Sequence, residues 1–156
     1  MSNLTIRNAN PADLDQITEI YADAVNNGTA SYELAPPSRE EMGTRYESLR
    51  AGGFPYLVAT DSDGTVLGYV YAGAFRPRPA YRFIVENSVY VAPRAKGRGV
   101  GRQLMEHLIE ATRALGFRQI VAVIGDGHSE SASVKLHERL GFRHSGRLVG
   151  SGYKHE

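Results

Sequence analysis

The stretch from Arg82 to Gly101, RFIVENSVYVAPRAKGRGVG, holds two features that could do chemistry. The apolar residues at both ends of its first half are typical of a buried β-strand, yet Glu86 stands in the middle. Burying an unpaired carboxylate is costly, and ion-paired or catalytic carboxylates are the usual exceptions. Glu86 is therefore either a catalytic carboxylate or one half of a structural ion pair with an arginine.

The second feature is the glycine loop RAKGRGVG, between this strand and the start of a helix. Free backbone N–H groups at a helix N-terminus bind anions, and glycines let a phosphate approach closely. Lys96 and Arg98 add positive charge, so a pyrophosphate is the expected ligand. The loop has neither the GxxxxGK-Ser/Thr pattern of a P-loop nor the GxGxxG spacing of a dinucleotide fold. Another type of phosphate loop and a plain connecting turn remain as alternatives.

Hydrophobic periodicity predicts the elements that must position these residues. Strands are expected at Leu4–Arg7, Tyr56–Thr60, Val66–Ala74, Arg82–Val91, Gln119–Ile124 and Phe142–Leu148. Helices are expected after the capping residues Asn10 and Ser38, from about Gly99, and around Ala132–Leu140, with stops at Gly28, Gly52, Gly116 and Gly141. The inward residues of the third helix are Val100, Leu104, Leu108, Ala111 and Leu115, and Gln119–Ile124 is expected to be covered on both faces. This order predicts a mixed α/β fold with a parallel crossover at its centre.

Composition limits the class of protein. The 156 residues, 42% of them hydrophobic, suit one domain with its own core, covering residues 1–156. The absence of cysteine excludes disulfides and thiolate chemistry and suits the cytoplasm. With 18 basic against 17 acidic residues, no nucleic-acid or membrane partner is expected. No signal peptide, membrane span or metal-ligand spacing is found, so no metal is expected.

The motifs resemble one superfamily. Arg94-Ala95-Lys96-Gly97-Arg98-Gly99 matches the acyl-CoA loop of the GNAT superfamily, which is Arg or Gln, two variable residues, Gly, one variable residue, and Gly or Ala. VYVAP, VAVI and LHERLGF resemble the GNAT core in order and spacing, over nearly the whole chain. GYVYAGAFRPRPAYR, VENSVYV, SVKLHERLGF and SGYKH are similar to phosphinothricin N-acetyltransferases, and equally to methionine sulfoximine and methionine sulfone acetyltransferases.

The resemblance implies a fold and a co-substrate. The fold is a mixed, mostly antiparallel sheet with a central splayed parallel strand pair and flanking helices. Acetyl-CoA lies in the split: its pantetheine arm pairs with the backbone of Val89, Tyr90 and Val91. Its pyrophosphate lies on the loop formed by Lys96, Gly97, Arg98, Gly99, Val100 and Gly101. The acetyl group passes directly to an amine in a ternary complex, without an acyl-enzyme.

The resemblance also implies roles for individual side chains. Glu86 falls on the family's general base, on the strand face shared by Ile84, Ser88 and Tyr90. A backbone N–H near Val89 is the expected donor to the thioester oxygen. His137 falls where many members have a tyrosine acid, so it could protonate the leaving thiolate or hold a water. The alternative for His137 is a histidine on the helix surface.

Substrate residues follow from the same comparison. An α-carboxylate or phosphinate needs a cationic clamp, which arginine provides. Phe75, Arg76 and Tyr81 match family substrate positions, and Arg78, Asn87 and Ser88 are further candidates. Arg78 could instead be a solvated surface residue, and Ser88 could only satisfy nearby backbone groups. Tyr32 and Phe75 could form apolar walls of the pocket or belong to the core.

Two departures from the family pattern are visible. Glu130 stands where an asparagine usually contacts the CoA arm, so we expect Glu130 to point away and Ser129 or Ser131 to replace it. The family also continues into a further strand beside Phe142–Leu148, so its final strand is expected to lie beyond the sequence given. The resemblance implies a homodimer. Two alternative functions remain. The protein could acetylate a polyamine, an aminoglycoside or a protein N-terminus, or it could be a non-catalytic CoA-binding module.

Overall fold

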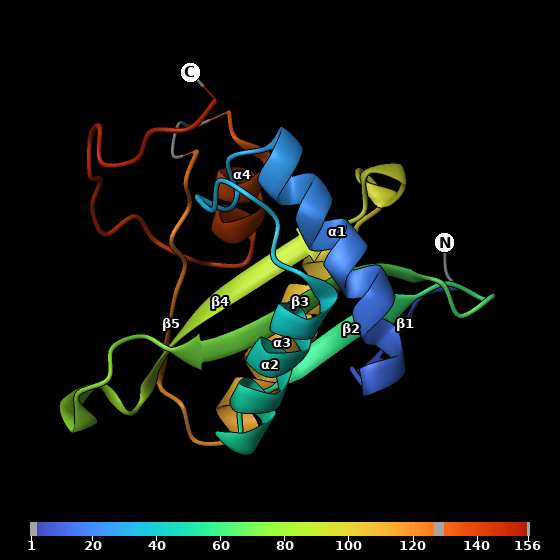
Figure 1. The fold of residues 1–156 in the computed structure, drawn as a ribbon. Helices are drawn as coiled ribbons and strands as arrows, with labels where there is room; N and C mark the ends of the chain where they lie inside the picture. The colour runs from blue at the N-terminus through green and yellow to red at the C-terminus, as the bar shows by residue number, and fades with distance from the viewer. Residues whose placement is uncertain (1–2, 127–129, 156) are drawn as a thin grey trace.

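The computed structural model describes residues 3–126 and 130–155, which form one sheet flanked by helices (Figure 1). The strands are β1 (Thr5–Asn8), β2 (Tyr56–Thr60), β3 (Val66–Ala74), β4 (Ile84–Val91) and β5 (Gln119–Val121). The α-helices are α1 (Leu14–Asn27), α2 (Arg39–Ala51), α3 (Val100–Ala114) and α4 (Ala132–Arg139). Short 3-10 turns lie at Pro11–Asp13, Pro79–Tyr81 and Pro93–Ala95.

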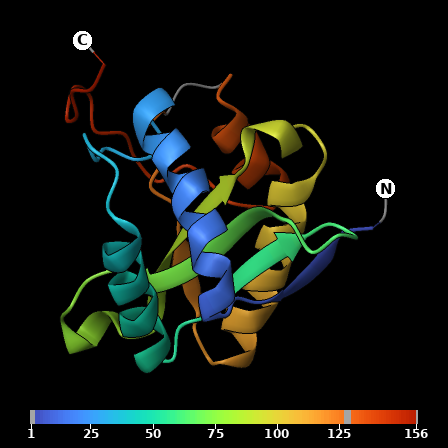
Figure 2. The same cartoon turned by 45° about the vertical axis from the view of Figure 1, so that its right-hand side comes forward.

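The sheet has the strand order β1-β2-β3-β4-β5, and only the pair β4-β5 is parallel. α1 and α2 cover one face and α3 lies on the other, with α4 above the end of β4 (Figures 1 and 2). The predicted fold class is confirmed. One detail differs: β5 is the edge strand of the described sheet, because no described strand pairs with its far side.

Tyrosines from three neighbouring strands stack on the face covered by α1 and α2. Tyr56 of β2 lies 5.9 Å from Tyr69 and 5.0 Å from Tyr71 of β3, between ring centroids. Tyr69 in turn lies 5.4 Å from Tyr90 of β4, which meets Tyr21 of α1 edge to face at 5.1 Å. Each aromatic pair adds about 0.5–1.5 kcal/mol beyond its buried area. The stack therefore fixes the position of β4, which carries the residues of interest.

The parallel pair separates after three residues. Ile84, Val85 and Glu86 pair with Gln119, Ile120 and Val121, and among the described residues β4 and β5 do not pair beyond this point. β4 continues to Val91 while the chain after β5 turns away (Figure 1). The splayed pair inferred from the resemblance is thus present, and it opens directly beyond Glu86.

Three details of the sequence-based prediction are wrong. Gln119–Ile124 is not a strand covered on both faces, because β5 ends at Val121 and Val123 is 67% exposed. Residues 142–148 form no strand: Leu148 is 83% exposed, and this segment runs outside the sheet without a partner strand among the described residues. Leu115 is 56% exposed because α3 ends before it and the chain turns at Gly116, which has φ 92°.

The start of α1 is held by a buried carboxylate. Asp13 accepts hydrogen bonds from both terminal nitrogens of Arg7 and from the backbone N–H of Asn10, each at 2.8 Å. Burial alone would raise the pKa of Asp13, but the bonds from Arg7 and Asn10 outweigh it, so the pKa is lowered. Because the folded pKa is depressed, the carboxylate stabilises the fold above its ordinary pKa, and this stabilisation is lost as pH falls through the folded pKa.

We therefore expect Asp13→Asn to lower the free energy of unfolding at neutral pH by about 1–3 kcal/mol. The difference from wild type should begin to shrink below about pH 4, where Asp13 of the unfolded chain gains a proton, and should vanish below the lowered pKa of the folded carboxyl. Urea unfolding followed by circular dichroism, at neutral pH and below about pH 4, measures the free energy of unfolding of both proteins. Asp15→Asn is the matched control, because the Asp15 side chain is 82% exposed. A difference that persists unchanged at low pH would contradict this account of Asp13.

Candidate active site

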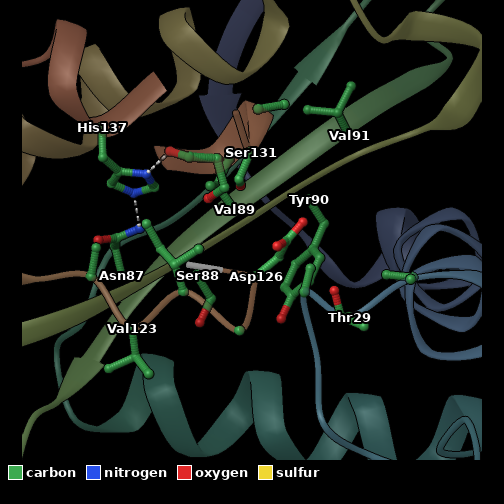
Figure 3. A pocket seen from close by; sticks show the side chains of 18 of the residues that line it. Thr29, Asn87, Ser88, Val89, Tyr90, Val91, Val123, Asp126, Ser131 and His137 are labelled. Atoms are coloured by element: carbon green, nitrogen blue, oxygen red, sulfur yellow. Dashed lines mark hydrogen bonds between the residues drawn. The ribbon is translucent and has the colours of Figure 1, made fainter. Parts of the chain in front are cut away.

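A cavity of about 760 Å³ lies where β4 and β5 part. β4 forms its floor from Glu86 to Val91, and the end of α1 with the following loop, the chain after β5, and the start of α4 form its walls. Figure 3 shows the side chains on β4 pointing alternately to opposite sides, with Tyr90 on one and Asn87 on the other. Tyr90 contacts Tyr21 of α1 and Asn87 contacts His137 of α4, so the predicted alternation along β4 is confirmed.

Glu86 lies in this cavity at the last position of β4 that pairs with β5, and it is half-buried. Burial raises the pKa of its carboxyl, and the positive charge of Arg76 partly opposes this. Arg76 does not form the ion pair considered from the sequence: its guanidinium lies 4.5 Å from the centre of the Phe75 ring and donates to the Phe75 carbonyl at 3.4 Å. A half-buried carboxylate with a raised pKa, open to a cavity, has the properties of a general base.

The influence of Arg76 on Glu86 can be measured directly. We expect Arg76→Met to raise the pKa of the Glu86 carboxyl, because only the burial effect then remains. In wild type, added salt should move this pKa in the same direction, because salt screens an exposed charge. An NMR titration of the labelled carboxyl measures both shifts. Arg78→Met is the control on the same loop, and an equal shift in that variant would contradict a specific effect of Arg76.

The glycine loop leads into the start of α3 and leaves that helix end without a side-chain cap. Gly97 and Gly99 have φ values of 78° and 79°, in the left-handed region that favours glycine. Gly99 is the N-cap of α3 and no side chain caps this end, so the first backbone N–H groups of the helix remain available to an anion. Lys96 also lines the cavity, and Arg98 is exposed nearby. The Val100 side chain is buried in the core, so only its backbone can take part in binding.

The candidate substrate residues fall into two groups. Asn87 and Ser88 line the large cavity beside Glu86. Arg76, Arg78 and Tyr81 instead line a smaller pocket of about 220 Å³ between the loop after β3 and the start of β4. Phe75 lines neither pocket and contacts Tyr81 edge to face at 5.9 Å. The structure therefore places the arginines outside the lining of the large cavity, and the charge of Arg76 lowers the pKa of Glu86 from there.

Loops supply further wall residues of the cavity, and among them only Tyr32 was a candidate from the sequence. Tyr32 does line the cavity, and its hydroxyl donates to the Gly125 carbonyl at 2.9 Å, which joins the loop after α1 to the chain after β5. Thr29, Ala30 and the segment 122–126 complete this wall. Such contacts join residues 93 positions apart, and no periodicity or motif in the sequence signals them.

The structure places Glu130 and Ser131, two of the three residues considered at the position where the family has an asparagine. Glu130 points to solvent and pairs with Lys135 at 3.0 Å, in agreement with the expectation that it turns away from the cavity. Ser131 lines the cavity, but its hydroxyl caps α4 by accepting from the Val134 N–H at 3.4 Å. Ser129, the other candidate, lies outside the described residues. Within the described part of the chain, no group of three or more metal-ligating side chains is found.

The sheet, the parting parallel strands and the uncapped helix behind a glycine loop define an α/β domain built to hold an extended anionic ligand beside a carboxylate. Comparison with known proteins gives the family. A model described as "Acetyltransferase (GNAT) domain" matches residues 6–156. The chain therefore belongs to the GNAT acetyltransferase family.

Curated relatives lie within one branch. The chain is 47% identical over 150 residues to a phosphinothricin N-acetyltransferase of Alcaligenes faecalis, a match that covers 96% of this chain and 75% of the relative. It is 43% identical over 150 residues to an L-methionine sulfoximine/L-methionine sulfone acetyltransferase of Pseudomonas aeruginosa, covering 96% and 86%.

Among solved structures, the fold is similar to a GNAT superfamily phosphinothricin acetyltransferase from Sinorhizobium meliloti in complex with acetyl-CoA. The TM-score is 0.95 and the identity is 49%, over 99% of this chain and 82% of that one. The family resemblance inferred from the motifs is thus confirmed. In the described residues, no helix is both long and apolar enough to cross a membrane.

Proposed function

We propose that this chain transfers the acetyl group of acetyl-CoA to the α-amine of a small amino-acid analogue, of the phosphinothricin, methionine sulfoximine or methionine sulfone type. The transfer is direct, within a ternary complex. The observation that carries the proposal is that Glu86 is a half-buried carboxylate in the cavity where β4 and β5 part. The substrate class is supported by the relatives, which are a phosphinothricin N-acetyltransferase and an L-methionine sulfoximine/L-methionine sulfone acetyltransferase.

The residues present fit acetyl-CoA. The uncapped N-terminus of α3, the left-handed Gly97 and Gly99, and Lys96 would hold the pyrophosphate. Beyond Glu86 the edge of β4 that faces β5 has no partner among the described strands, so the backbone of Val89, Tyr90 and Val91 would pair with the pantetheine arm. Acetyl-CoA supplies an activated acetyl thioester when bound.

Glu86 then acts on the amine. An aliphatic amine is mostly protonated at neutral pH, and only its neutral form attacks a thioester. The Glu86 carboxylate takes this proton, directly or through one water. Asn87 and Ser88 line the cavity next to this carboxylate. Arg76, Arg78 and Tyr81 of the smaller pocket, with Phe75 packed against Tyr81, bind the acidic end of the substrate. The bidentate geometry of arginine suits a carboxylate or a phosphinate.

The remaining expectations stay proposals. We propose that residues 1–156 form one GNAT domain, that the protein acts in the cytoplasm, and that it is a homodimer without nucleic-acid, membrane or metal partners. The absence of cysteine supports the cytoplasmic location, and the near-neutral net charge of +1 supports the lack of nucleic-acid and membrane partners. Size-exclusion chromatography with light scattering tests the dimer.

CoA release from acetyl-CoA across a panel of amines tests the activity. The panel holds phosphinothricin, methionine sulfoximine, methionine sulfone, spermidine, an aminoglycoside and a peptide. Turnover of any of the first three, well above that of the others, is the expected result. Turnover confined to spermidine, the aminoglycoside or the peptide would overturn the substrate class. Bound acetyl-CoA without turnover on any amine would overturn the activity.

A further inference from the structure

His137 of α4 is buried in the wall of the cavity instead of lying on the helix surface. It is 4% exposed, and its ring meets Phe142 edge to face at 4.9 Å. Its Nδ1 lies 2.7 Å from the Ser133 carbonyl oxygen, and its Nε2 lies 3.2 Å from Nδ2 of Asn87 (Figure 3). Both ring nitrogens are therefore engaged by the protein.

These contacts select one tautomer of His137. A carbonyl oxygen only accepts, so Nδ1 must carry the proton that is donated to Ser133. In the neutral ring Nε2 then has only its lone pair, and it accepts a hydrogen bond from the Asn87 amide nitrogen. Burial lowers the pKa of His137, partly opposed by the Ser133 carbonyl, so the neutral ring is favoured at neutral pH.

The same bond fixes the Asn87 side chain. Asn87 is 7% exposed and lines the cavity, and among the described residues its Oδ1 has no hydrogen-bond partner. Turning the amide over would place Oδ1 against the Nε2 lone pair of His137, two acceptors facing each other. His137 therefore determines which atom of Asn87 faces α4 and which stays unpaired.

The Asn87–His137 hydrogen bond lies directly beside Glu86 in the chain. Asn87 lies between Glu86 and Ser88, at the first residue of β4 beyond the pairing with β5. β3 still pairs with β4 here, through Ala72 and Asn87, but β5 no longer does, and the Asn87–His137 bond links this free edge of the strand directly to α4. Because Glu86 and Ser88 are the chain neighbours of Asn87, a hydrogen bond that restrains Asn87 also restrains the backbone from which their side chains project.

We propose that His137 is a positioning residue, which in its neutral, Nδ1-protonated form fixes Asn87 and through it the Glu86–Ser88 segment of β4. This inference rests on the proposed role of Glu86 as the base. A proton donor to the leaving thiolate would need a proton on Nε2, the nitrogen that accepts from Asn87. The role of His137 is therefore mechanical and electrostatic, and the proton for the thiolate comes from another group or from water.

The first test does not depend on activity. Long-range 1H–15N NMR of the imidazole distinguishes its tautomers. Because burial lowers the pKa of His137, we expect the Nδ1-protonated, neutral pattern at neutral pH and above. In Asn87→Ala the Nε2 resonance should shift, because its hydrogen bond is lost. A doubly protonated ring, or the Nε2-protonated tautomer, over this range would overturn the proposal whether or not any amine is turned over.

The second test separates positioning from acid catalysis. His137→Gln can still accept from Asn87 through its side-chain oxygen but cannot transfer a proton, whereas His137→Leu can do neither. We expect His137→Gln to keep kcat within about 5-fold of wild type, and His137→Leu to lose about 10- to 100-fold, the range expected from misplacing a catalytic group. The alkaline side of the kcat–pH profile should be the same in wild type and His137→Gln.

The double variant His137→Leu, Asn87→Ala should be at most about 3-fold worse than His137→Leu, because the two residues act as a unit. Equal losses in His137→Gln and His137→Leu, with the alkaline limb gone in both, would identify a proton donor and overturn the proposal. Thermal melting of each variant checks that the fold is retained. A wild type that acetylates no amine would instead overturn the proposed function and leave the NMR result standing.

Discussion

Glu86→Gln is expected to lower kcat/KM for the amine by about 100- to 10,000-fold, the range that general-base catalysis supplies. Glutamine has nearly the same shape but cannot take a proton from the ammonium group. The affinity for acetyl-CoA should change by less than about 2-fold, because the groups expected to hold it lie further along β4 and at the start of α3. Steady-state kinetics with the amine that wild type uses best, and calorimetric binding of acetyl-CoA, measure the two quantities.

The pH profile provides a second readout of the same variant. Wild-type kcat/KM should fall as pH is lowered through the pKa of Glu86, since only the carboxylate accepts a proton. Because burial raises this pKa, the fall should begin at a higher pH than for an exposed glutamate. The residual activity of Glu86→Gln should lack this acidic limb.

Glu130→Gln is the matched control for Glu86→Gln. Its carboxylate is 77% exposed and pairs with Lys135 outside the cavity, so kcat/KM should stay within about 2-fold of wild type. If Glu86→Gln retained wild-type activity and its acidic limb, the base would have to be another group. An equal loss in both variants would point to a general electrostatic effect instead of proton transfer at position 86.

Gly68→Val is expected to lower the free energy of unfolding by about 2–3 kcal/mol, which corresponds to a fall in Tm of roughly 5–10 °C. Gly68 lies in β3 directly opposite Val91. A Cβ atom at this position would lie 2.9 Å from the Tyr90 carbonyl oxygen and 3.2 Å from side-chain atoms of both Val100 and Leu104. The backbone oxygen cannot move without shifting β4, so the strain would remain in the folded protein.

Gly146→Val is the control, because a Cβ atom at Gly146 meets nothing within 4 Å and the residue does not need the left-handed conformation. We expect its Tm to change by less than about 2 °C. Gly68→Val should also raise the KM for acetyl-CoA, because the displaced segment carries Tyr90 and Val91 at the floor of the cavity. Equal melting temperatures for Gly68→Val and wild type would show that β4 yields at this point without loss of stability.

Local patterns in the sequence were sufficient for most of the fold. The strands Tyr56–Thr60 and Val66–Ala74 have the predicted bounds, and the Asp61–Gly64 turn between them forms because Asp61 accepts from the N–H groups of Asp63 and Thr65. Caps at Asn10 and Ser38 and the stop at Gly28 also stand where they were predicted. These features depend on hydrogen bonds and backbone conformations within a few residues, so the local sequence encodes them.

The predictions that failed concern segments whose structure depends on distant partners. Residues 142–148 were predicted to form a strand, but a strand needs a neighbour to satisfy its backbone groups, and none is placed beside this segment in the described chain. Gln119–Ile124 is apolar enough for a buried strand, yet the separation of β5 from β4 ends it after Val121. Composition alone could not place that separation.

The candidate site divides in the same way. The sequence by itself determined Glu86 as a carboxylate within a strand, and the glycine loop as the start of a helix, because both are properties of contiguous residues. Only the tertiary structure decided that His137 is buried against Asn87, that Arg76 acts on Glu86 while it rests on Phe75, and that Tyr32 meets Gly125. These relations depend on distances between segments far apart in the chain, which packing of the helices on the sheet sets and residue spacing does not.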